Sequence, residues 1–262
     1  MNFISSLNPI LIGTAIIAII QPQVAVALTR EEISAKAEQI TVRIDGKDDN
    51  SSGSGVIIER NGDTYVVITN YHVIQNVSVS YKVQTSDGKQ YPVNYSQVRR
   101  IPRVDLAILQ FTSSQNYQKA EIGNSDEIKI GSQVYATGFP VPGPGNSKRD
   151  YLFLSGLISG RNSGAKNGYE LAHGINSISG MSGGPIFNEQ GLLIGIYGAS
   201  SVDPRTGSAT FGLGIPINIY KKFALSAQPV VTGSQSTSSP KSINICNTQI
   251  SLEEAVKQRC RI

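Results

Sequence analysis

Short runs of β-branched and aromatic residues fill the sequence between residues 40 and 216, and they constrain its fold more than any other feature. Turn signals such as NGD at 61–63 and SDGK at 86–89 separate the runs. Runs of this length predict strands, and the 26 Gly and 12 Pro of the chain supply turns. Six runs lie before a join near residues 112–130 and six after it, with no helical pattern between them. The sequence therefore predicts an all-β fold of two tandem six-stranded antiparallel β-barrels.

Two short helices and a polar tail accompany the predicted barrels. Thr29 and Glu32 have the spacing of a capping box, which predicts an N-terminal helix over residues 28–39. The segment PINIYKKFAL predicts a second helix before the chain becomes rich in Ser and Thr. The expected domains are the N-terminal helix at 28–39, a first barrel at 40–115, a second barrel with its C-terminal helix at 116–227, and a linker with a short tail at 228–262.

The first 27 residues have a different composition from the rest. The run ILIGTAIIAII, residues 10–20, precedes Ala25-Val26-Ala27, which has the small-x-small pattern of a signal-peptidase site. The run is shorter than the roughly 20 residues that a membrane-spanning helix needs. We therefore predict a signal peptide at 1–27 and an exported protein, periplasmic or extracellular, without stable membrane insertion after cleavage. An uncleaved anchor is the alternative.

Charge and cysteine content limit the partners. The formal net charge is +4 and basic residues are scattered, so we expect a solvated surface and no nucleic-acid partner. A monomer is expected as well. With two histidines and dispersed carboxylates, no metal site or cofactor is expected. Cys246 and Cys260 would close a loop of about 14 residues as a disulfide in an oxidising compartment, and two free thiols are the alternative.

The segment SGMSGGP, residues 179–185, places Ser182 among three glycines. A serine hydroxyl becomes a good nucleophile only when a neighbouring base takes its proton, so a catalytic Ser182 requires a histidine. The chain has two, His72 and His173, and both precede Ser182. The segment also fits the nucleophile elbow of α/β-hydrolases, but in that class the acid and the histidine follow the serine. That class is excluded, and the order histidine, acid, serine remains.

His72 and Asp105 are the candidates that complete a triad. His72 ends the strand pattern VVITNYHVI, and strand ends present reactive groups to a cleft. Asp105, in RVDLAILQF, shares a predicted strand face with Ala107 and Leu109, where a carboxylate is costly unless it is hydrogen-bonded. An imidazole Nδ1–H would satisfy it. A plain core or surface histidine, and an aspartate paired with Arg103 or solvent, are the alternatives for each residue alone.

The glycines fit the same chemistry. The tetrahedral intermediate of acyl transfer needs backbone N–H donors, and those of Gly180 and Ser182 are the natural oxyanion hole. Glycine also permits a tight turn and a close approach of backbone and substrate. An ordinary glycine-rich turn would explain one or two of these glycines equally well, but it would not explain His72 and Asp105.

Three motifs in this order resemble the trypsin-like serine peptidases of the chymotrypsin fold, bacterial type, close to the protease domain of the Deg heat-shock peptidases. They are GSGVIIE with TNYHVI, then VDLAIL, then GMSGGPIFNEQGLLIGI. The resemblance covers about residues 40–225. It implies a serine endopeptidase that acts on protein or peptide through an acyl-enzyme, with His72 as general base and acid, Asp105 as its orienting group and Ser182 as nucleophile.

The resemblance also implies a substrate pocket. Asn176 would lie near its floor, with Tyr197, Gly198 and Gly212 around its walls, and because none of these is acidic an uncharged substrate side chain is expected. His173 lining the pocket and favouring an acidic side chain is the alternative.

The sequence departs from the family at one position of the serine motif and leaves two other functions open. Met181 stands where digestive trypsins carry an aspartate that pairs with a newly cut N-terminus, so activation by that ion pair is not expected. A catalytically inactive homologue that binds extended peptides by strand addition, and an esterase, are the alternative functions.

Overall fold

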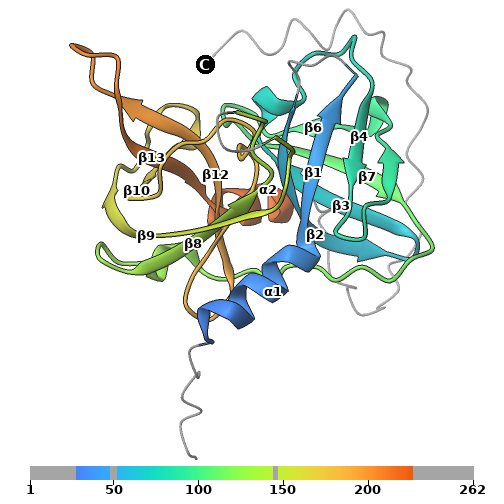
Figure 1. The fold of residues 1–262 in the computed structure, drawn as a ribbon, viewed down its shortest axis with the longest axis horizontal. Coiled ribbons are helices and arrows are strands. Elements are labelled where there is room, and N and C mark those ends of the chain that lie inside the picture. Colours follow the sequence, from blue (N-terminus) through green and yellow to red (C-terminus); the bar gives the residue numbers. More distant parts are fainter. Residues whose placement is uncertain (1–27, 48–51, 144–146, 227–262) are drawn as a thin grey trace, which may run out of the picture. The chain divides into compact units, whose positions relative to one another are not determined.

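The computed structural model describes residues 28–47, 52–143 and 147–226, which are coloured in Figure 1. They form an open β-sheet, a closed β-barrel and two α-helices, with four short 3₁₀ turns among the described residues. The predicted signal peptide at 1–27, the tail at 228–262 and the pair Cys246 and Cys260 lie outside the described residues. Within the described part of the chain, no helix has the length and apolar character needed to cross a membrane.

The first half of the described chain forms an antiparallel sheet of seven strands in the order β5-β4-β1-β2-β3-β7-β6. The strands and the two 3₁₀ turns among them are β1 (Thr41–Gly46), β2 (Ser52–Asn61), β3 (Thr64–Thr69), η1 (Tyr71–Val73), β4 (Tyr81–Gln84), β5 (Gln90–Pro92), η2 (Tyr95–Gln97), β6 (Arg99–Arg100) and β7 (Ala107–Thr112). In the register of the central strands, Ile68 of β3 lies opposite Val56 of β2 and Ile108 of β7, so their β-branched side chains share one apolar face.

The second half forms a closed barrel of six strands in the order β10-β13-β12-β11-β8-β9. Its elements are η3 (Ser125–Glu127), β8 (Gln133–Gly138), β9 (Leu152–Arg161), η4 (Lys166–Gly168), β10 (Leu171–His173), β11 (Pro185–Phe187), β12 (Leu193–Val202) and β13 (Ala209–Pro216). Every neighbouring pair in the barrel is antiparallel.

The mostly-β character and the six-stranded second barrel are confirmed. The first half has seven strands rather than six, and its pairing does not close into a barrel. Its edge strands, β5 and β6, are only three and two residues long. Strands this short present few backbone groups for further pairing, so the sheet stays open at its edges.

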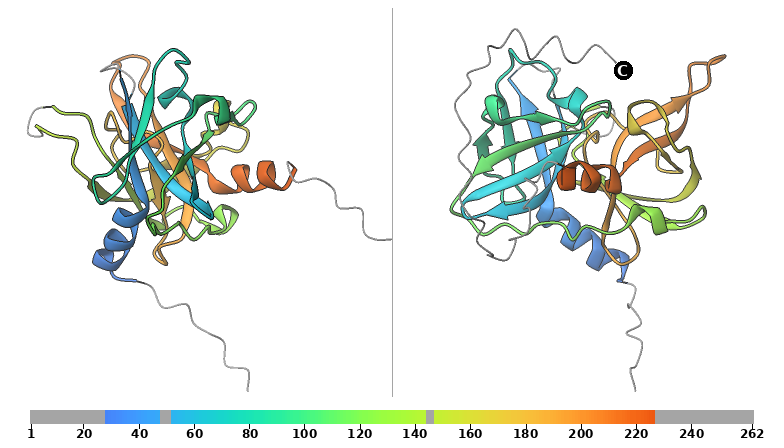
Figure 2. Two further views of the ribbon diagram at one scale, coloured as in Figure 1. Left: turned by 90° about the vertical axis from the view of Figure 1, so that its right-hand side faces the viewer. Right: turned by 180° about the vertical axis from the view of Figure 1, so that it is seen from behind.

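A shared apolar cluster joins the two halves. It combines Ile58 and Ile68 of the sheet with Phe187 and Ile196 of the barrel, and both helices contribute to it. The hydroxyl groups of Thr41 and Thr137 also form a buried hydrogen bond of 2.7 Å between β1 and β8. Side chains from both halves fill one close-packed cluster, so the halves pack directly against each other, and Figures 1 and 2 show them side by side. A site can therefore take residues from both.

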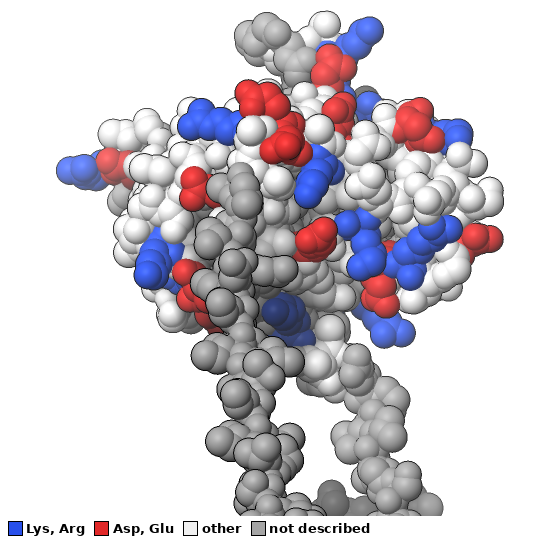
Figure 3. Space-filling model, turned by 90° about the horizontal axis from the view of Figure 1, so that it is seen from below, with Lys and Arg blue, Asp and Glu red and all other residues white. Residues whose placement is uncertain are grey.

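The helices lie on the outside of the two β structures (Figure 2). Helix α1 (Arg30–Ile40) begins with the predicted capping box, in which Thr29 Oγ1 accepts from the Glu32 N–H and Glu32 Oε2 accepts from the Thr29 N–H. Helix α2 (Ile217–Ser226) follows β13 directly and buries Ile217 and Tyr220. On the face drawn in Figure 3, Lys and Arg alternate with Asp and Glu, so this face carries no extended patch of one sign.

Candidate active site

His72 lies in η1, the 3₁₀ turn that follows β3. β3 is buried along almost all of its length, and Val73 anchors the turn in the core of the first sheet. The His72 side chain itself is 40% exposed. The imidazole is therefore held on a rigid strand end and is open to a substrate.

Asp105 holds His72 through two hydrogen bonds. His72 Nδ1 lies 2.6 Å from Asp105 Oδ2, and the His72 backbone N–H donates to Oδ1 at 2.9 Å. A carboxylate at Nδ1 selects the imidazole tautomer that carries its proton there. Nε2 is then left with a free lone pair, which is the state that a general base needs.

The backbone of Asp105 departs from the predicted strand. Strand β7 begins two residues later, at Ala107, so the prediction that Asp105 lies within the strand is wrong. The reason is that its main chain bonds to partners outside the sheet. Its N–H donates to the Asn167 carbonyl oxygen at 3.0 Å, and its carbonyl oxygen accepts from Asn70 Nδ2 at 2.9 Å.

The Asp105 carboxyl group stays ionised in spite of its burial. Desolvation by itself raises its pKa, because burial disfavours the charged form. Hydrogen bonds from His72 and from the Tyr169 hydroxyl group outweigh this effect and hold the pKa below its ordinary value. The side chain, 13% exposed, is thus a negative charge beside His72 at neutral pH.

Ser182 lies in the turn between β10 and β11. Its Oγ donates to the Gly198 carbonyl oxygen at 3.2 Å, and this is the hydrogen bond that the described residues show for it, rather than one to His72. Gly198 in turn packs against Asn70 and Tyr169, which both bond to Asp105. The serine therefore shares its immediate neighbours with the His72–Asp105 pair.

The glycines around Ser182 are required by close packing. Gly183 has a φ of +88°, and a Cβ there would lie 2.1 Å from Thr69 Oγ1 and 2.2 Å from the Ser54 carbonyl oxygen. Gly180 has a φ of +90°, and a Cβ there would lie 2.5 Å from the Val141 nitrogen. Side chains at these positions would meet backbone atoms, which cannot move aside. The serine turn is thus wedged between both halves of the molecule.

The backbone N–H groups of Gly180 and Ser182 are free for a ligand: no hydrogen bond of the described residues uses either one. The preceding carbonyl oxygen, that of Ser179, accepts from the Val141 N–H at 2.9 Å. In a trans peptide the N–H points away from the carbonyl oxygen, so the Gly180 N–H is directed away from Val141. Two backbone donors on one turn can bind an oxyanion.

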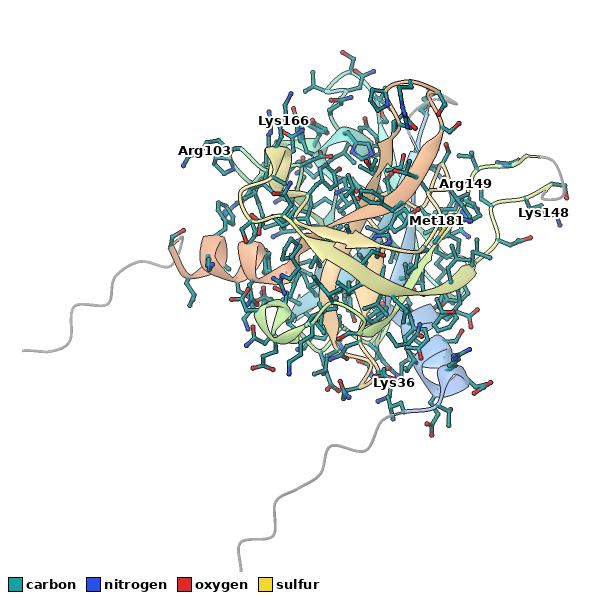
Figure 4. The ribbon with its side chains drawn as sticks, turned by 90° about the vertical axis from the view of Figure 1, so that its left-hand side faces the viewer. Lys36, Arg103, Lys148, Arg149, Lys166 and Met181 are labelled. Carbon is teal, nitrogen blue, oxygen red and sulfur yellow. The ribbon has the colours of Figure 1, made fainter. Side chains whose placement is uncertain are left out.

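Ser54 bonds to this turn and Arg149 bonds to the segments beside it, and the sequence did not indicate either one. Ser54 Oγ donates to the Gly180 carbonyl oxygen and accepts from the Phe139 N–H, both at 2.8 Å. Arg149, labelled in Figure 4, donates to the Phe139 and Gly53 carbonyl oxygens, and the Phe139 N–H in turn donates to Ser54 Oγ. Ser54 lies in SSGSG, residues 51–55, which has the composition of a turn although β2 begins at Ser52, whereas Arg149 lies in a loop without a recognisable motif.

The four residues expected around a substrate pocket take part in three different contacts. Tyr197 is 1% exposed, and its hydroxyl group donates to the Asn176 carbonyl oxygen at 2.5 Å inside the barrel. Gly198 contacts Ser182 as described above. Gly212 lies against the buried ring of His173, whose Cε1 would be 2.2 Å from a Cβ at that position.

Tyr169 is a site residue that sequence analysis missed. Its hydroxyl group donates to Asp105 Oδ2 at 2.5 Å. It also lines a cavity of about 530 Å³ next to β9, β10 and β13, together with Lys166, Phe211 and Leu213. No motif marks this tyrosine, because the contact with Asp105 joins residues 64 positions apart.

Within the described residues, no group of three or more His, Cys, Asp or Glu side chains has an arrangement that could hold a metal ion. The chemistry that this arrangement supports is nucleophilic catalysis by a serine, with an imidazole as base and a carboxylate behind it.

Comparison with known proteins agrees with that chemistry. The chain matches the trypsin-like peptidase domain over residues 53–196, a segment that contains His72, Asp105 and Ser182. It is 34% identical over 185 residues to the periplasmic serine endoprotease DegP of Escherichia coli strain K12. It is also 34% identical over 188 residues to a probable serine protease do-like of Buchnera aphidicola subsp. Acyrthosiphon pisum. Each match covers 69% of this chain and 36% of the relative, so the chain spans little more than a third of these proteins.

A solved structure shares the fold. The HtrA-type protease AlgW with tripeptide superposes with a TM-score of 0.61 at 24% sequence identity, over 76% of this chain and 63% of that protein. At this level of identity the likeness supports the arrangement of the two β structures.

Proposed function

The chain belongs to the family of trypsin-like peptidase domains, and from this premise we propose that it is a serine endopeptidase. The observation that carries the proposal is the 2.6 Å contact of His72 Nδ1 with Asp105 Oδ2, next to a serine on a tightly packed glycine turn. This is the arrangement that acyl-transfer chemistry requires.

In the proposed mechanism, the Ser182 hydroxyl group turns from the Gly198 carbonyl oxygen toward His72 Nε2. As Ser182 Oγ attacks the peptide carbonyl carbon, Nε2 takes its proton, and Asp105 stabilises the resulting imidazolium. His72 then gives the proton to the leaving amine, and an acyl-enzyme remains. Water attacks the acyl carbon with His72 again as base, which releases the acid product and restores Ser182.

The N–H groups of Gly180 and Ser182 would bind the oxyanion of both tetrahedral intermediates. Support comes from the observation that no other described residue bonds to these N–H groups, and from the bonds of Val141 and Ser54 to the carbonyl oxygens around them. Because these bonds exist before substrate arrives, the donors need no reorganisation during the reaction, which is where such sites gain their effect.

We also propose an uncharged substrate side chain next to the scissile bond. The pocket would be formed by Asn176, Gly198 and Gly212, none of which carries a charge, with Tyr197 behind Asn176. His173, which is buried and neutral, offers no positive charge for an acidic substrate side chain.

The architecture and location follow the same family. The seven-stranded sheet would correspond to the first barrel of a double-barrel peptidase, with the domain limits stated above. Residues 1–27 would direct export, and the matched DegP proteins are described as periplasmic, so we propose a periplasmic location. The substrates would be proteins or peptides, and the chain would act as a monomer.

A fluorophosphonate probe, which reacts with activated serines, tests the function. We expect one adduct per chain on the wild-type protein and none on Ser182→Ala, with peptidase turnover lower by about 10⁶-fold in the variant. Ser179→Ala, on the same turn and exposed, is the matched control and should react like the wild type.

Two other outcomes would identify the alternative functions. A folded wild-type protein that binds peptides but forms no adduct would be an inactive peptide-binding homologue. A protein that reacts with the probe but cleaves small esters far better than peptides would be an esterase, since a peptidase gains transition-state binding from remote parts of its substrate.

A further inference from the structure

The Asp105 carboxylate accepts three hydrogen bonds, and two of them come from His72 itself. The third comes from the Tyr169 hydroxyl group, which donates to Oδ2, the same oxygen that contacts His72 Nδ1. Among the described residues, Tyr169 is therefore the only group other than His72 that fixes the orientation of this carboxylate. A carboxylate held at one oxygen by a second donor cannot rotate away from the imidazole without breaking that bond.

The loop that carries Tyr169 is docked on the turn that carries Asp105. The Asn167 carbonyl oxygen accepts from the Asp105 N–H at 3.0 Å. Gly168, with a φ of +81°, lies against Val104, which would be 2.8 Å from a Cβ at that position. Figure 4 shows Arg103 and Lys166, one from each segment, on the same side of the molecule. The backbone bond between Asn167 and Asp105 thus positions Tyr169 beside the carboxylate to which it donates.

Gly198 leaves the space that this hydroxyl group occupies. A Cβ at position 198 would lie 2.8 Å from the Tyr169 hydroxyl oxygen and 2.6 Å from Asn70 Oδ1. The carbonyl oxygen of the same glycine accepts from Ser182 Oγ. Tyr169 is therefore in contact with the backbone that bonds the serine as well as with the carboxylate behind the histidine.

We propose that Tyr169 is a positioning residue of the active site, which orients the Asp105 carboxylate toward His72 by donating a hydrogen bond to Oδ2. This proposal rests on the proposed peptidase function. Tyr169 acts through Asp105 and touches neither the substrate nor the reacting atoms. It donates a hydrogen bond without losing its proton, because burial and the neighbouring Asp105 raise the pKa of its hydroxyl group.

The hydroxyl group also draws part of the negative charge of Asp105 away from the imidazole. Of the described titratable groups, His72 and Tyr169 are those that act on this carboxylate, whereas nearby Arg100 lies over the Tyr71 ring at 4.1 Å. Without the hydroxyl group, more of the charge of Asp105 would face the protonated imidazole and stabilise it. The protonation midpoint that controls activity would then move to higher pH.

The test is Tyr169→Phe, which removes one hydroxyl group and keeps the ring. Tyr151→Phe is the matched control, because Tyr151 is also largely buried and its hydroxyl group donates to a single backbone oxygen, that of Ser34. In purified protein, the rate of fluorophosphonate labelling should fall about tenfold or more in Tyr169→Phe, as expected for the loss of a hydrogen bond to a charged group. The acidic midpoint of its pH profile should rise by about half a pH unit. Tyr151→Phe should match the wild type in both respects.

Two results would overturn the proposal. One is a wild-type rate with an unchanged midpoint in Tyr169→Phe. The other is a reduced rate with an unchanged midpoint, because a purely structural role would lower the amount of competent protein without changing the titration.

A second measurement separates this proposal from the peptidase function. The chain has two histidines, so the His72 ring signal in NMR spectra can be assigned with one His72→Ala sample. Its titration midpoint should rise in Tyr169→Phe even if the wild-type protein does not react with the probe. An unreactive wild type with a shifted midpoint would refute the peptidase function and leave Tyr169 as a partner that orients Asp105. An unshifted midpoint would refute the role of Tyr169.

Discussion

The two histidines of the chain lie in opposite environments. His72 is 40% exposed at a strand end, with Asp105 at Nδ1. His173 is completely buried in the barrel, and its ring packs against Tyr197. Burial lowers the pKa of His173 to about 4, so it is neutral at ordinary pH. Histidine is thus a candidate general base at position 72 and a neutral, buried core side chain at position 173.

The difference shows that the partner makes a histidine useful in catalysis. A general base must be accessible to its proton donor and must gain stability when it takes the proton. Asp105 provides that stability for His72, whereas the surroundings of His173 oppose protonation. Three substitutions can break or sharpen this contrast.

Substitution of His72 should have the largest effect. His72→Ala removes the base, so we expect peptidase turnover to fall by about 10⁶-fold, as large as the loss from removing the nucleophile. Stability should change little because the side chain is exposed, and circular dichroism with urea unfolding would check this. If His72→Ala kept wild-type turnover, His72 would not be the general base, and its different environment from His173 would not matter for catalysis.

Substitution of Asp105 should have the next largest effect. An asparagine can present its amide group to Nδ1 and so place the imidazole proton on Nε2, where it blocks the attack. Asp105→Asn should therefore lower turnover by about 10⁴-fold while His72 stays in place. The measurement is turnover of a peptide substrate at neutral pH.

Asp87→Asn is the matched control for that measurement. Asp87 is also a hydrogen-bonded carboxylate, with its pKa lowered to about 2 by bonds from Thr85, Tyr117 and Lys89 that outweigh desolvation. None of these partners belongs to the proposed active site, so turnover should stay at the wild-type level. Equal losses in both variants would show that loss of any hydrogen-bonded carboxylate has the same effect, against a specific role for Asp105.

The contrast also explains how far the sequence could predict the site. His72, Asp105 and Ser182 were singled out because two histidines before one glycine-flanked serine leave a single possible order of residues. The contact of His72 with Asp105 is seen in the structure. Tyr169 and Ser54 were missed because their bonds to Asp105 and Gly180 join segments 64 and 126 positions apart, and hydrophobic periodicity contains no information about such pairings.

The fold was predictable to a similar depth. Alternating apolar runs located most strands and the six-stranded barrel, because the strands of a barrel bury one face. The open edges of the first sheet could not be predicted, since β6 is two residues long and has no period to detect. Asp105 was placed on a strand because its neighbours alternate, but bonds from Asn167 and Asn70 turn its backbone out of the sheet.

Substitution of His173 should have the smallest effect on catalysis and a distinct effect on stability. His173→Leu keeps a side chain of similar size in the barrel, so turnover should stay within a few-fold of the wild type.

In the unfolded chain, His173 regains its ordinary pKa near 6.5, whereas in the fold the pKa is about 4. Between these two pKa values, His173 binds a proton in the unfolded state but not in the folded state. The free energy of unfolding therefore falls as the pH drops below about 6.5. From about pH 7.5 to about pH 5 the wild type should lose about 2 kcal/mol more than His173→Leu in urea unfolding, since each pKa unit corresponds to about 1.4 kcal/mol. The carboxylates with lowered pKa are present in both proteins, so the difference isolates His173. An equal loss in the two proteins would mean that His173 can take up a proton inside the barrel. Burial would then not keep His173 neutral, and the two histidines would differ only in where they lie.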